Sequence, residues 1–372
     1  MIRATLMAEM DMAGMQPDYS RQMLLKEIGP AGQARLGSSR VLVVGAGGLG
    51  TPVLQYLAGA GVGCIGIVDA DVLDASNLHR QPLYALADVG VPKVDLARAA
   101  LARLNPAVRI ETHAVRFGAG NAAALLDGDD LVVDCSDNFR TKFLINDAAV
   151  LARKPAVFAS VYQYEGQVQV YKPAAAHACL RCLWPHATTD GIVGNCAEAG
   201  VLGPVPGALG AMEALLALKV LLDLPGQLDG TLLLMDLAQF TTVRLRAPRR
   251  PACVAPHCSL IHALPGEDPD LDLEIESLPA AARRGFEPID IRNADELAHR
   301  PAAGRHIPMA ALLADPGALG AGGRYLLVCA SGRRSAAAAR ELRARGFTVA
   351  SLAGGLQRLD AAARERAGPA SA

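Results

Sequence analysis

A glycine-rich segment, GAGGLG at residues 45–50, begins the part of this chain whose residue types could do chemistry. Glycine lets a backbone approach a phosphate closely where a helix begins, and the positive end of that helix favours the anion. Asp69 follows at the spacing at which dinucleotide-binding folds carry an acid that holds a ribose. The pattern predicts a nucleotide site with Gly45, Gly47 and Gly48 beneath the phosphates. It leaves open which nucleotide binds.

Side chains that follow Asp69 distinguish between the nucleotides. A nicotinamide dinucleotide requires only the acid at this point, whereas here an amide, an arginine and a lysine come after it. Arginine clamps phosphate oxygens through two donors and lysine acts as a point charge, so the set favours a triphosphate with its metal ion. An ordinary polar loop explains any single member better than it explains the whole set, which comprises Ser76, Asn77, Leu78, His79, Arg80, Gln81 and Lys93.

A second group of acids follows an apolar run at residues 131–138, LVVDCSDN. Ligands of parallel sheets bind at the carboxyl ends of the strands, so Asp137 and its neighbour Asn138 are expected to face the same crevice as the glycines. A carboxylate is a hard ligand of the kind that Mg²⁺ prefers. Cys135 is predicted to be a small core residue rather than a nucleophile.

Cys329 lies between a predicted strand at residues 324–328 and a predicted helix that begins near residue 335. Backbone N–H groups at a helix start and flanking arginines favour a thiolate and stabilise an anionic sulfur chain on it. The related loop of phosphatases is longer and encloses a phosphate, whereas this shorter loop suits a terminal sulfur. The predicted persulfide loop consists of Cys329, Gly332, Arg333, Arg334 and Ser335.

Four of the eight cysteines form two pairs, Cys179 with Cys182 and Cys253 with Cys258. Four thiolates would close a tetrahedral zinc site, and a closed site is structural because no position is left for water. The second pair is spaced C-x4-C. Either both of its sulfurs fold inward or His257 replaces one of them, and four unrelated thiols are the remaining alternative.

Several elements must position these residues. Apolar strands at residues 41–44 and 65–68, joined by the glycine loop and a helix, form a βαβ unit. The uncharged run at residues 41–68 is long enough to raise the question of a membrane span, but its glycines and Pro52 favour the buried βαβ unit. The net charge of −1 offers no basic face for nucleic acid. The acids Glu9 and Asp11 argue against a signal peptide. Together these features predict a cytoplasmic protein without membrane or nucleic-acid partners.

The combination GxGGxG, Asp69, SNLxRQ, Lys93 and DCSDN, preceded by YSRQ at residues 19–22, resembles the adenylation domain shared by ubiquitin-activating enzymes and the bacterial activators of sulfur-carrier proteins of the molybdopterin and thiamine type. The resemblance covers roughly residues 18–260. It implies ATP as cofactor and, as substrate, the C-terminal Gly-Gly carboxylate of a small ubiquitin-like carrier. It further implies that Asp69 holds the ribose and that Asp137 holds Mg²⁺.

The same resemblance assigns two residues that their own surroundings do not single out. Arg21 is expected to reach the active site of the other subunit in a homodimer. Cys196 occupies the place of a conjugating cysteine on a crossover segment, with an inert loop thiol as the alternative. Asn77, Arg80 and Lys93 are implied to bind the triphosphate. Arg80, Asp137 and Cys196 are the expected catalytic residues of this domain, and Cys329 is the expected catalytic residue of the C-terminal part of the chain.

The C-terminal part of the chain resembles a rhodanese domain. The features shared are Cys329 with its arginines, DIR at residues 290–292, His299 with Pro301 in a degraded His-x-Pro region, and the pair Gly354 and Gly355. The resemblance implies that Cys329 carries a persulfide supplied by a sulfur donor such as a cysteine desulfurase.

These expectations combine into an α/β protein with a Rossmann-like adenylation domain, whose sheet is mostly parallel, and a smaller α/β rhodanese domain. The predicted ranges are a disordered extension at 1–17, an adenylyltransferase domain at 18–263, a linker at 264–276, a rhodanese domain at 277–368 and a tail at 369–372. The expected activity is adenylation of the carrier and conversion to a thiocarboxylate. Molybdopterin synthesis is favoured over thiamine, tRNA-thiolation and cysteine pathways. A nicotinamide-dependent oxidoreductase and a non-catalytic docking scaffold are the alternatives.

Overall fold

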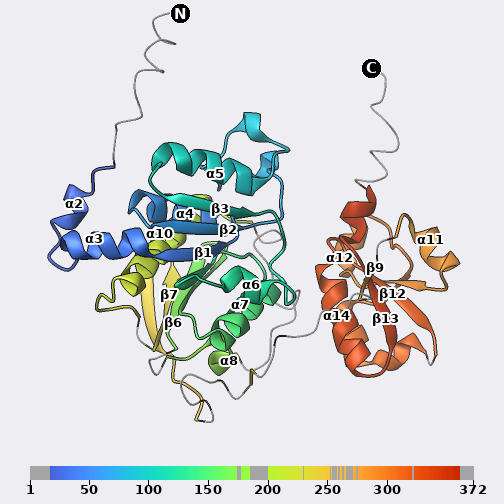
Figure 1. Cartoon of the computed structure of the whole chain (residues 1–372). Coiled ribbons are helices and arrows are strands. Elements are labelled where there is room, and N and C mark those ends of the chain that lie inside the picture. The colour runs from blue at the N-terminus through green and yellow to red at the C-terminus, as the bar shows by residue number, and fades with distance from the viewer. Residues whose placement is uncertain are drawn as a thin grey trace, which may run out of the picture. The chain divides into compact units, whose positions relative to one another are not determined.

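The computed structural model describes residues 17–173, 177–184, 200–228, 230–251, 253, 258, 260–261, 264, 271–273, 275–320 and 322–360, apart from the side chains of Asp272, His299 and Arg333. Cys196 and His257 lie outside these residues. The described residues divide into two compact units, one up to residue 264 and the other from residue 271 onward (Figure 1). Each unit is built around its own sheet.

The first unit contains an eight-stranded sheet in the order β3-β2-β1-β4-β5-β6-β7-β8. The strands from β3 to β5 are parallel, and β6, β7 and β8 extend the sheet in antiparallel fashion. This order confirms the predicted Rossmann-like fold with a mostly parallel sheet. The strands are β1 (Arg40–Val44), β2 (Cys64–Val68), β3 (Arg109–His113), β4 (Leu131–Asp134), β5 (Ala156–Tyr162), β6 (Glu165–Tyr171), β7 (Thr231–Asp236) and β8 (Thr241–Arg246).

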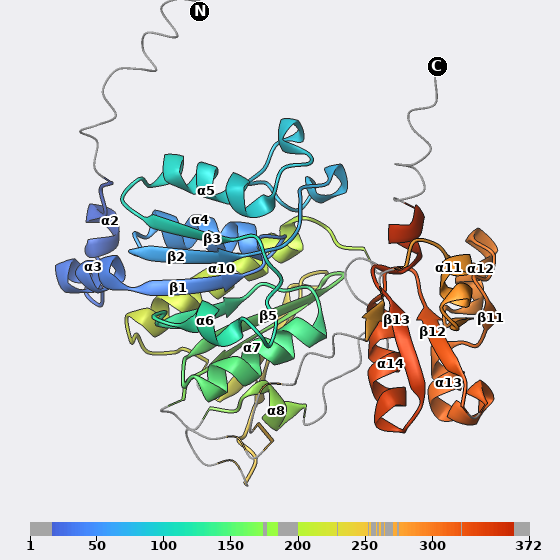
Figure 2. The same ribbon diagram turned by 45° about the vertical axis from the view of Figure 1, so that its right-hand side comes forward.

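Helices cover both faces of this sheet, as β-strands with two apolar faces require. One apolar cluster packs beneath α4, α5 and α10, and a second packs beneath α6 and α7 (Figure 2). The helices are α2 (Ser20–Met23), α3 (Gly29–Ser38), α4 (Gly50–Gly59), α5 (Lys93–Leu104), α6 (Ala122–Leu126), α7 (Phe139–Leu151), α8 (Leu180–Leu183) and α10 (Pro204–Leu221), with the 3₁₀ turns η2 (Ala75–Asn77) and η3 (Leu86–Asp88).

Helix α10 is apolar along almost its whole length because it is a core helix. Within the described residues it alone is long and apolar enough to cross a membrane, yet it packs against α4, β5 and β6 with Leu209 and Ala217 fully buried. The helix begins at Pro204, because proline is well suited to the first turn of a helix.

The second unit contains a parallel five-stranded sheet in the order β11-β10-β12-β13-β9. Its edge strand β9 pairs with β13 and lies at Asp272–Leu273, inside the segment predicted to be a linker, so the unit begins earlier than residue 277. The elements are β9 (Asp272–Leu273), α11 (Leu278–Arg283), β10 (Glu287–Asp290), α12 (Ala294–His299), β11 (Arg305–His306), α13 (Met309–Ala314), η4 (Pro316–Leu319), β12 (Arg324–Val328), α14 (Arg333–Ala344) and β13 (Thr348–Leu352).

Candidate functional site

The glycine loop between β1 and α4 is packed tightly against the end of β4. Gly45 has a φ of +103°, and a Cβ atom there would lie 2.6 Å from the carbonyl oxygen of Cys135. A Cβ atom on Gly50 would lie 2.0 Å from the carbonyl oxygen of Gly45. Only glycine meets both the backbone conformation and the close approach. The loop is therefore held in one shape at the carboxyl end of the parallel strands.

Asp69 joins the end of β2 to this loop. Its Oδ2 atom accepts a 2.7 Å hydrogen bond from the N–H of Ala46, and its Oδ1 atom accepts a 2.8 Å bond from the N–H of Asp71. Burial raises the pKa of the Asp69 carboxyl, while these two N–H donors and the nearby Lys93 oppose the rise. The acid predicted to hold a ribose thus also stabilises the loop beside it.

Tyr84 supports the same loop and was not anticipated from the sequence. Its buried hydroxyl donates a 2.9 Å hydrogen bond to the carbonyl oxygen of Ala46. Burial raises the pKa of Tyr84, so the hydroxyl keeps its proton and remains a donor. The available signal was an aromatic residue closely following the polar stretch at residues 76–81.

The polar stretch after Asp69 folds into a capped turn, η2, beside the glycine loop. The Asp74 side chain accepts a 2.8 Å hydrogen bond from the N–H of Ser76, and an Arg80 guanidinium nitrogen donates 3.0 Å to the carbonyl oxygen of Ser76. The imidazole Nδ1 of His79 lies 3.0 Å from that same carbonyl oxygen. The Asn77 side chain closes the cap by accepting from the N–H of Asp74 at 3.4 Å.

Two further members of the stretch face inward. Leu78 packs against the apolar core. Gln81 is buried, with its amide nitrogen 3.6 Å from the position a Cβ atom would take on Gly47. The start of α10 closes over this region, because Pro206 lies 3.3 Å from the equivalent position on Gly48. The residues predicted to contact the nucleotide from residue 45 to residue 81 are therefore brought together.

Lys93 places a positive charge at the same edge of the sheet. It begins α5 and is only 5% exposed, and its Nζ atom lies 3.1 Å from Oδ2 of Asp71. The N–H of Lys93 also donates to the carbonyl oxygen of Asp71 at 3.0 Å. A mostly buried ammonium near Asp69 suits an anionic ligand, because burial weakens the screening of its charge by water.

The turn after β4 carries the predicted magnesium ligand. Asp137 is exposed on this turn, and its Oδ1 atom accepts a 3.3 Å hydrogen bond from the side-chain amide of Asn138. Asn138 caps α7 by accepting a 2.8 Å bond from the N–H of Thr141. Cys135 is buried, which confirms that it is a core residue, and burial raises the pKa of its thiol well above the usual range.

Arg21 lies away from the other predicted site residues of its own chain. It is exposed on α2. Its neighbour Gln22 donates a 3.2 Å hydrogen bond to the carbonyl oxygen of Ala60, at the end of α4 and just before β2. The hydroxyl of Tyr19 accepts 2.8 Å from Asn105, just before β3. Arg21 is therefore placed at the amino ends of the strands, opposite the glycine loop.

The four paired cysteines converge on one small cavity. The Sγ atoms of Cys179 and Cys258 lie 3.8 Å apart, and those of Cys253 and Cys258 lie 3.6 Å apart. A hydrogen bond with Cys179 lowers the pKa of the Cys182 thiol to about 5. The cavity between the four measures about 10 Å³. Among the described residues, no group of three or more His, Cys, Asp or Glu side chains is arranged so that it could hold a metal ion.

Helix α7 holds the first of these cysteine pairs in place. The side-chain oxygen of Asn146 accepts a 2.7 Å hydrogen bond from the N–H of Leu180. The guanidinium of Arg181 donates to both carboxylate oxygens of Asp147, at 3.0 and 2.6 Å, and lies 4.7 Å from the centre of the Phe143 ring. These contacts fix the turn between Cys179 and Cys182.

In the second unit, Cys329 directly follows β12 and is fully buried. Its Sγ atom lies 3.4 Å from both the N–H nitrogen and the hydroxyl oxygen of Ser335. Gly332 has a φ of +83° and caps α14. Gly354 and Gly355 pack beneath the loop, and a Cβ atom on Gly355 would lie 2.4 Å from the nitrogen of Gly332. The predicted persulfide loop is thus closed around the thiol.

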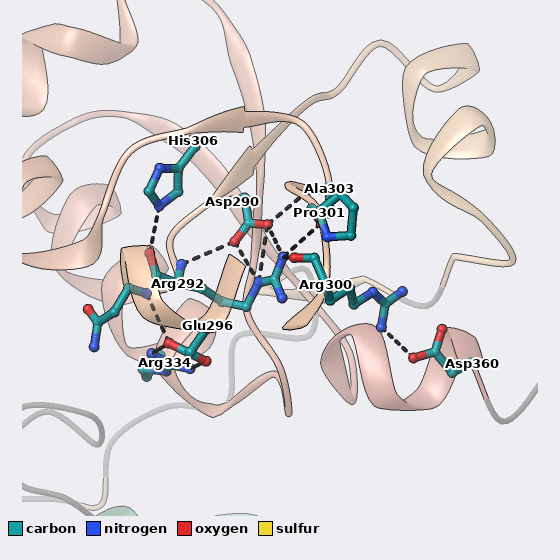
Figure 3. Close-up of polar contacts among 10 residues, drawn as sticks. Asp290, Arg292, Glu296, Arg300, Pro301, Ala303, His306, Arg334 and Asp360 are labelled. Atoms are coloured by element: carbon teal, nitrogen blue, oxygen red, sulfur yellow. Dashed lines mark hydrogen bonds and ion pairs between the residues drawn. The ribbon is translucent and has the colours of Figure 1, made fainter. Parts of the chain in front are cut away.

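Arg334 is held by an acid that the sequence did not single out. Its guanidinium donates to both carboxylate oxygens of Glu296, at 2.6 and 2.5 Å (Figure 3). This ion pair with Arg334 lowers the pKa of Glu296, and burial opposes the change. Arg333 begins α14, but its side chain is outside the described atoms.

A second ion pair supports the same region. Buried Arg292 pairs with Asp290 at 2.7 Å and donates to the carbonyl oxygen of Pro301 at 3.1 Å. The imidazole of His306 lies 2.7 Å from the carbonyl oxygen of Arg292 (Figure 3). His306 belongs to an intact His-x-Pro triplet at residues 306–308 that the sequence interpretation overlooked in favour of His299 and Pro301.

The first unit of this chain is similar in sequence to known proteins. Residues 19–255 match the ThiF family. A sulfur carrier protein adenylyltransferase of Thermus thermophilus is 50% identical over 239 residues, which cover 63% of this chain and 88% of that protein. Proteins named adenylyltransferase and sulfurtransferase MOCS3 are 48% identical over 63% of this chain, in Anopheles gambiae over 53% of that protein and in Mus musculus over 51%. The chain therefore spans about half the length of these MOCS3 relatives.

Solved structures show the same fold at lower identity. The crystal structure of E. coli MccB superposes with a TM-score of 0.57 and 20% identity, over 67% of this chain and 75% of that one. The structure of MccB with MccA-N7isoASN gives a TM-score of 0.54 at 21% identity, covering 60% and 68% of the two chains.

Proposed function

This chain belongs to the ThiF family, and from that premise we propose that it uses MgATP to adenylate the C-terminal carboxylate of a small ubiquitin-like sulfur carrier ending in Gly-Gly. The observation that carries the proposal is the buried Lys93 ammonium beside Asp69 and Asp71 at the edge of the glycine loop. A nicotinamide dinucleotide site does not require this cation, whereas the negative charge of a triphosphate is stabilised by it. The names of the relatives from Thermus thermophilus and Anopheles gambiae support the same activity.

In the proposed first step, the carrier carboxylate attacks the α-phosphorus of ATP, and the pyrophosphate leaves with the electrons of the broken P–O bond. Catalysis of such transfers lies chiefly in positioning and charge stabilisation. Arg80 and Lys93 would hold the phosphates, and Asp137 would hold the magnesium ion. That ion supplies neutralisation of phosphate charge when it is bound.

A homodimer forms part of the proposal because Arg21 cannot reach the glycine loop of its own chain. Leu24 and Leu25 lie beside Arg21 and are 72% and 55% exposed. Two adjacent exposed leucines form a small apolar surface, which supports a protein–protein contact at the end of α2. Such a contact would carry Arg21 of the partner subunit into the site.

The second proposed step transfers sulfur. Cys329 would carry a persulfide received from a donor such as a cysteine desulfurase. The terminal sulfur attacks the acyl carbon of the adenylate, AMP leaves, and an acyl disulfide forms. Attack of a second thiol on Cys329 Sγ then releases the thiocarboxylate and leaves a disulfide, which two external thiols reduce as they are oxidised to a disulfide of their own. Cys196 is the candidate for the second thiol. The closed loop around Cys329 supports the assignment of a rhodanese domain to the second unit.

A structural zinc ion is proposed for the cysteine cluster. Thiolates held about 2.3 Å from zinc in a tetrahedron lie about 3.8 Å from one another, and the separations of 3.8 and 3.6 Å fit this value. Cys179, Cys182, Cys253 and Cys258 would be the ligands. Both sulfurs of the C-x4-C pair turn inward, which favours them over His257.

We also propose molybdopterin synthesis as the pathway and the cytoplasm as the location. Thiamine, tRNA-thiolation and cysteine pathways use the same chemistry, and assays with one Gly-Gly carrier from each would distinguish them.

The adenylation step is tested by carrier-dependent exchange between ATP and pyrophosphate. The wild-type protein is expected to catalyse exchange and Asp137→Ala to lose it. Undiminished exchange in Asp137→Ala would show that the site is wrongly assigned. Carrier binding without exchange in the wild type would instead support a docking scaffold. For the second step, Cys329→Ala is expected to abolish thiocarboxylate formation when persulfide is the sole sulfur source, while exchange continues.

A further inference from the structure

A buried group of charged side chains lies beneath the turn that carries Asp137. It consists of Asp134 at the end of β4, Lys142 in α7 and Glu213 in α10, which are 0%, 5% and 0% exposed. The Lys142 ammonium forms an ion pair with Asp134 and donates a 2.6 Å hydrogen bond to the carbonyl oxygen of Ala159 on β5. None of the three has a part in the binding or chemistry described above.

The ion pair is connected to both sides of the turn. Oδ1 of Asp134 accepts hydrogen bonds from the N–H of Ser136 at 3.0 Å and from its hydroxyl at 2.5 Å. Ser136 directly precedes Asp137. On the other side, Lys142 lies in the first turns of α7, whose N-cap is Asn138. Asp137 therefore lies between Ser136, which is bonded to Asp134, and the start of α7, which carries Lys142. Both sides of the turn are connected to the same buried ion pair.

The same group joins the turn to the glycine loop and to α10. The carbonyl oxygen of Cys135 lies against Gly45, as described above, and the thiol of Cys135 donates a 3.7 Å hydrogen bond to Oε2 of Glu213. Burial and the neighbouring Asp134 raise the pKa of Glu213 well above its usual value, which favours the protonated carboxyl. A protonated Glu213 carboxyl beside the Asp134–Lys142 ion pair avoids the free-energy cost of burying a second negative charge.

We propose that Lys142 is a positioning residue: with Asp134 and Glu213 it holds the turn of residues 136–138 so that the Asp137 carboxylate meets a magnesium ion on phosphates above the glycine loop. The proposal rests on the proposed function, because it takes Asp137 as a magnesium ligand. Without Lys142, the buried Asp134 carboxylate would be unpaired, and such a charge is strongly unfavourable. The turn would then rearrange or admit water. Residues that support metal ligands typically affect metal affinity by about 10–100-fold.

The test measures ATP binding by the full-length protein as a function of Mg²⁺ concentration, which requires neither carrier nor turnover. Lys142→Met is expected to raise the half-saturating Mg²⁺ concentration about tenfold or more. Lys142→Arg keeps the charge and should restore that concentration to within about threefold of the wild type. Ser136→Ala, which leaves the core intact, should raise it by roughly threefold. The matched control is Lys154→Met, since Lys154 also donates to a carbonyl oxygen, that of Asp129, but at the other end of α7.

An unchanged Mg²⁺ requirement in Lys142→Met would overturn the proposal, and so would an equal rise in Lys154→Met. If Lys142→Met fails to fold, Ser136→Ala decides, and a wild-type Mg²⁺ requirement in that variant counts against the proposal. ATP binding by the wild type that does not respond to Mg²⁺ also counts against it. Failure of the proposed function looks different: the wild type would bind MgATP but show no exchange with any carrier.

Discussion

The carboxylate of Asp69 accepts a 2.7 Å hydrogen bond from the backbone N–H of Ala46. The bond links the end of β2 to the glycine loop that follows β1, two parallel neighbours in the sheet. The residue expected to bind a ribose is therefore also part of the structure that shapes the phosphate loop. Changes at Asp69 should affect both.

Asp69→Asn is predicted to raise the KM for ATP in pyrophosphate exchange by roughly tenfold, because hydrogen bonds to a charged acceptor are stronger than those to an amide oxygen. Asp69→Ala should have a larger effect. The matched control is Asp130→Asn, because Asp130 accepts a 2.9 Å bond from the N–H of Arg40 at the opposite end of the sheet. A similar rise in KM in this control would point to a general loss of stability instead.

Arg21→Ala and Asp137→Ala are each predicted to be inactive alone and to recover activity when the two are mixed and allowed to exchange subunits. Half of the dimers would then be mixed, and one of the two sites in each would have both residues intact. Recovery should therefore reach about one quarter of the wild-type rate. Arg35→Ala, a nearby exposed arginine on α3, should remain active alone. Absence of recovery in the mixture would show that Arg21 does not act across subunits.

Cys182→Ser is predicted to lose a bound zinc ion, measured by elemental analysis of the purified protein, and to lower the Tm of the first unit by roughly 10 °C. The cause is loss of one of four ligands from a closed site. Cys64→Ser serves as the control, because Cys64 is a buried free cysteine on β2. A wild-type protein that contains no zinc after expression with added metal would rule out the structural role.

Stability around Cys329 should depend on pH through Glu296. Pairing with Arg334 lowers the pKa of Glu296 below its ordinary 4.5, so the stabilisation is fully present above about pH 4.5 and is lost as the pH falls through the lower pKa of the folded state. Glu296→Gln should therefore reduce hydrogen-exchange protection of α14 at pH 7. The difference from the wild type should shrink toward pH 3. A difference that is equal at both values would exclude the ion pair as its source.

Local patterns were sufficient to predict much of the fold. Apolar runs at residues 41–44 and 65–68 became β1 and β2, because buried parallel strands are continuous apolar segments. The strand before Cys329 and the helix after it were also predictable, since each is a short local pattern. The edge strand β9 was missed because two residues in an acidic, proline-containing segment have no periodicity of their own, and they become a strand only by pairing with β13.

The sequence alone determined the chemical inventory of this protein: the glycines, Asp69, Lys93, the acids after β4, the paired cysteines and Cys329. These residues could be identified from residue type and spacing, because binding a phosphate, a metal ion or a sulfur atom requires particular side chains close together in the sequence. Only the tertiary structure decided what supports them. Tyr84 meets Ala46, Glu296 meets Arg334, and Lys142 meets Asp134 at the end of a neighbouring strand. Glu213 reaches Cys135 from a helix far along the chain. Three of these contacts join segments at least 38 residues apart, and the Lys142–Asp134 pair, eight residues apart, depends on how α7 packs after β4. The glycine loop could therefore be predicted from the sequence, while the buried charges beneath the turn of residues 136–138 became visible only in the fold.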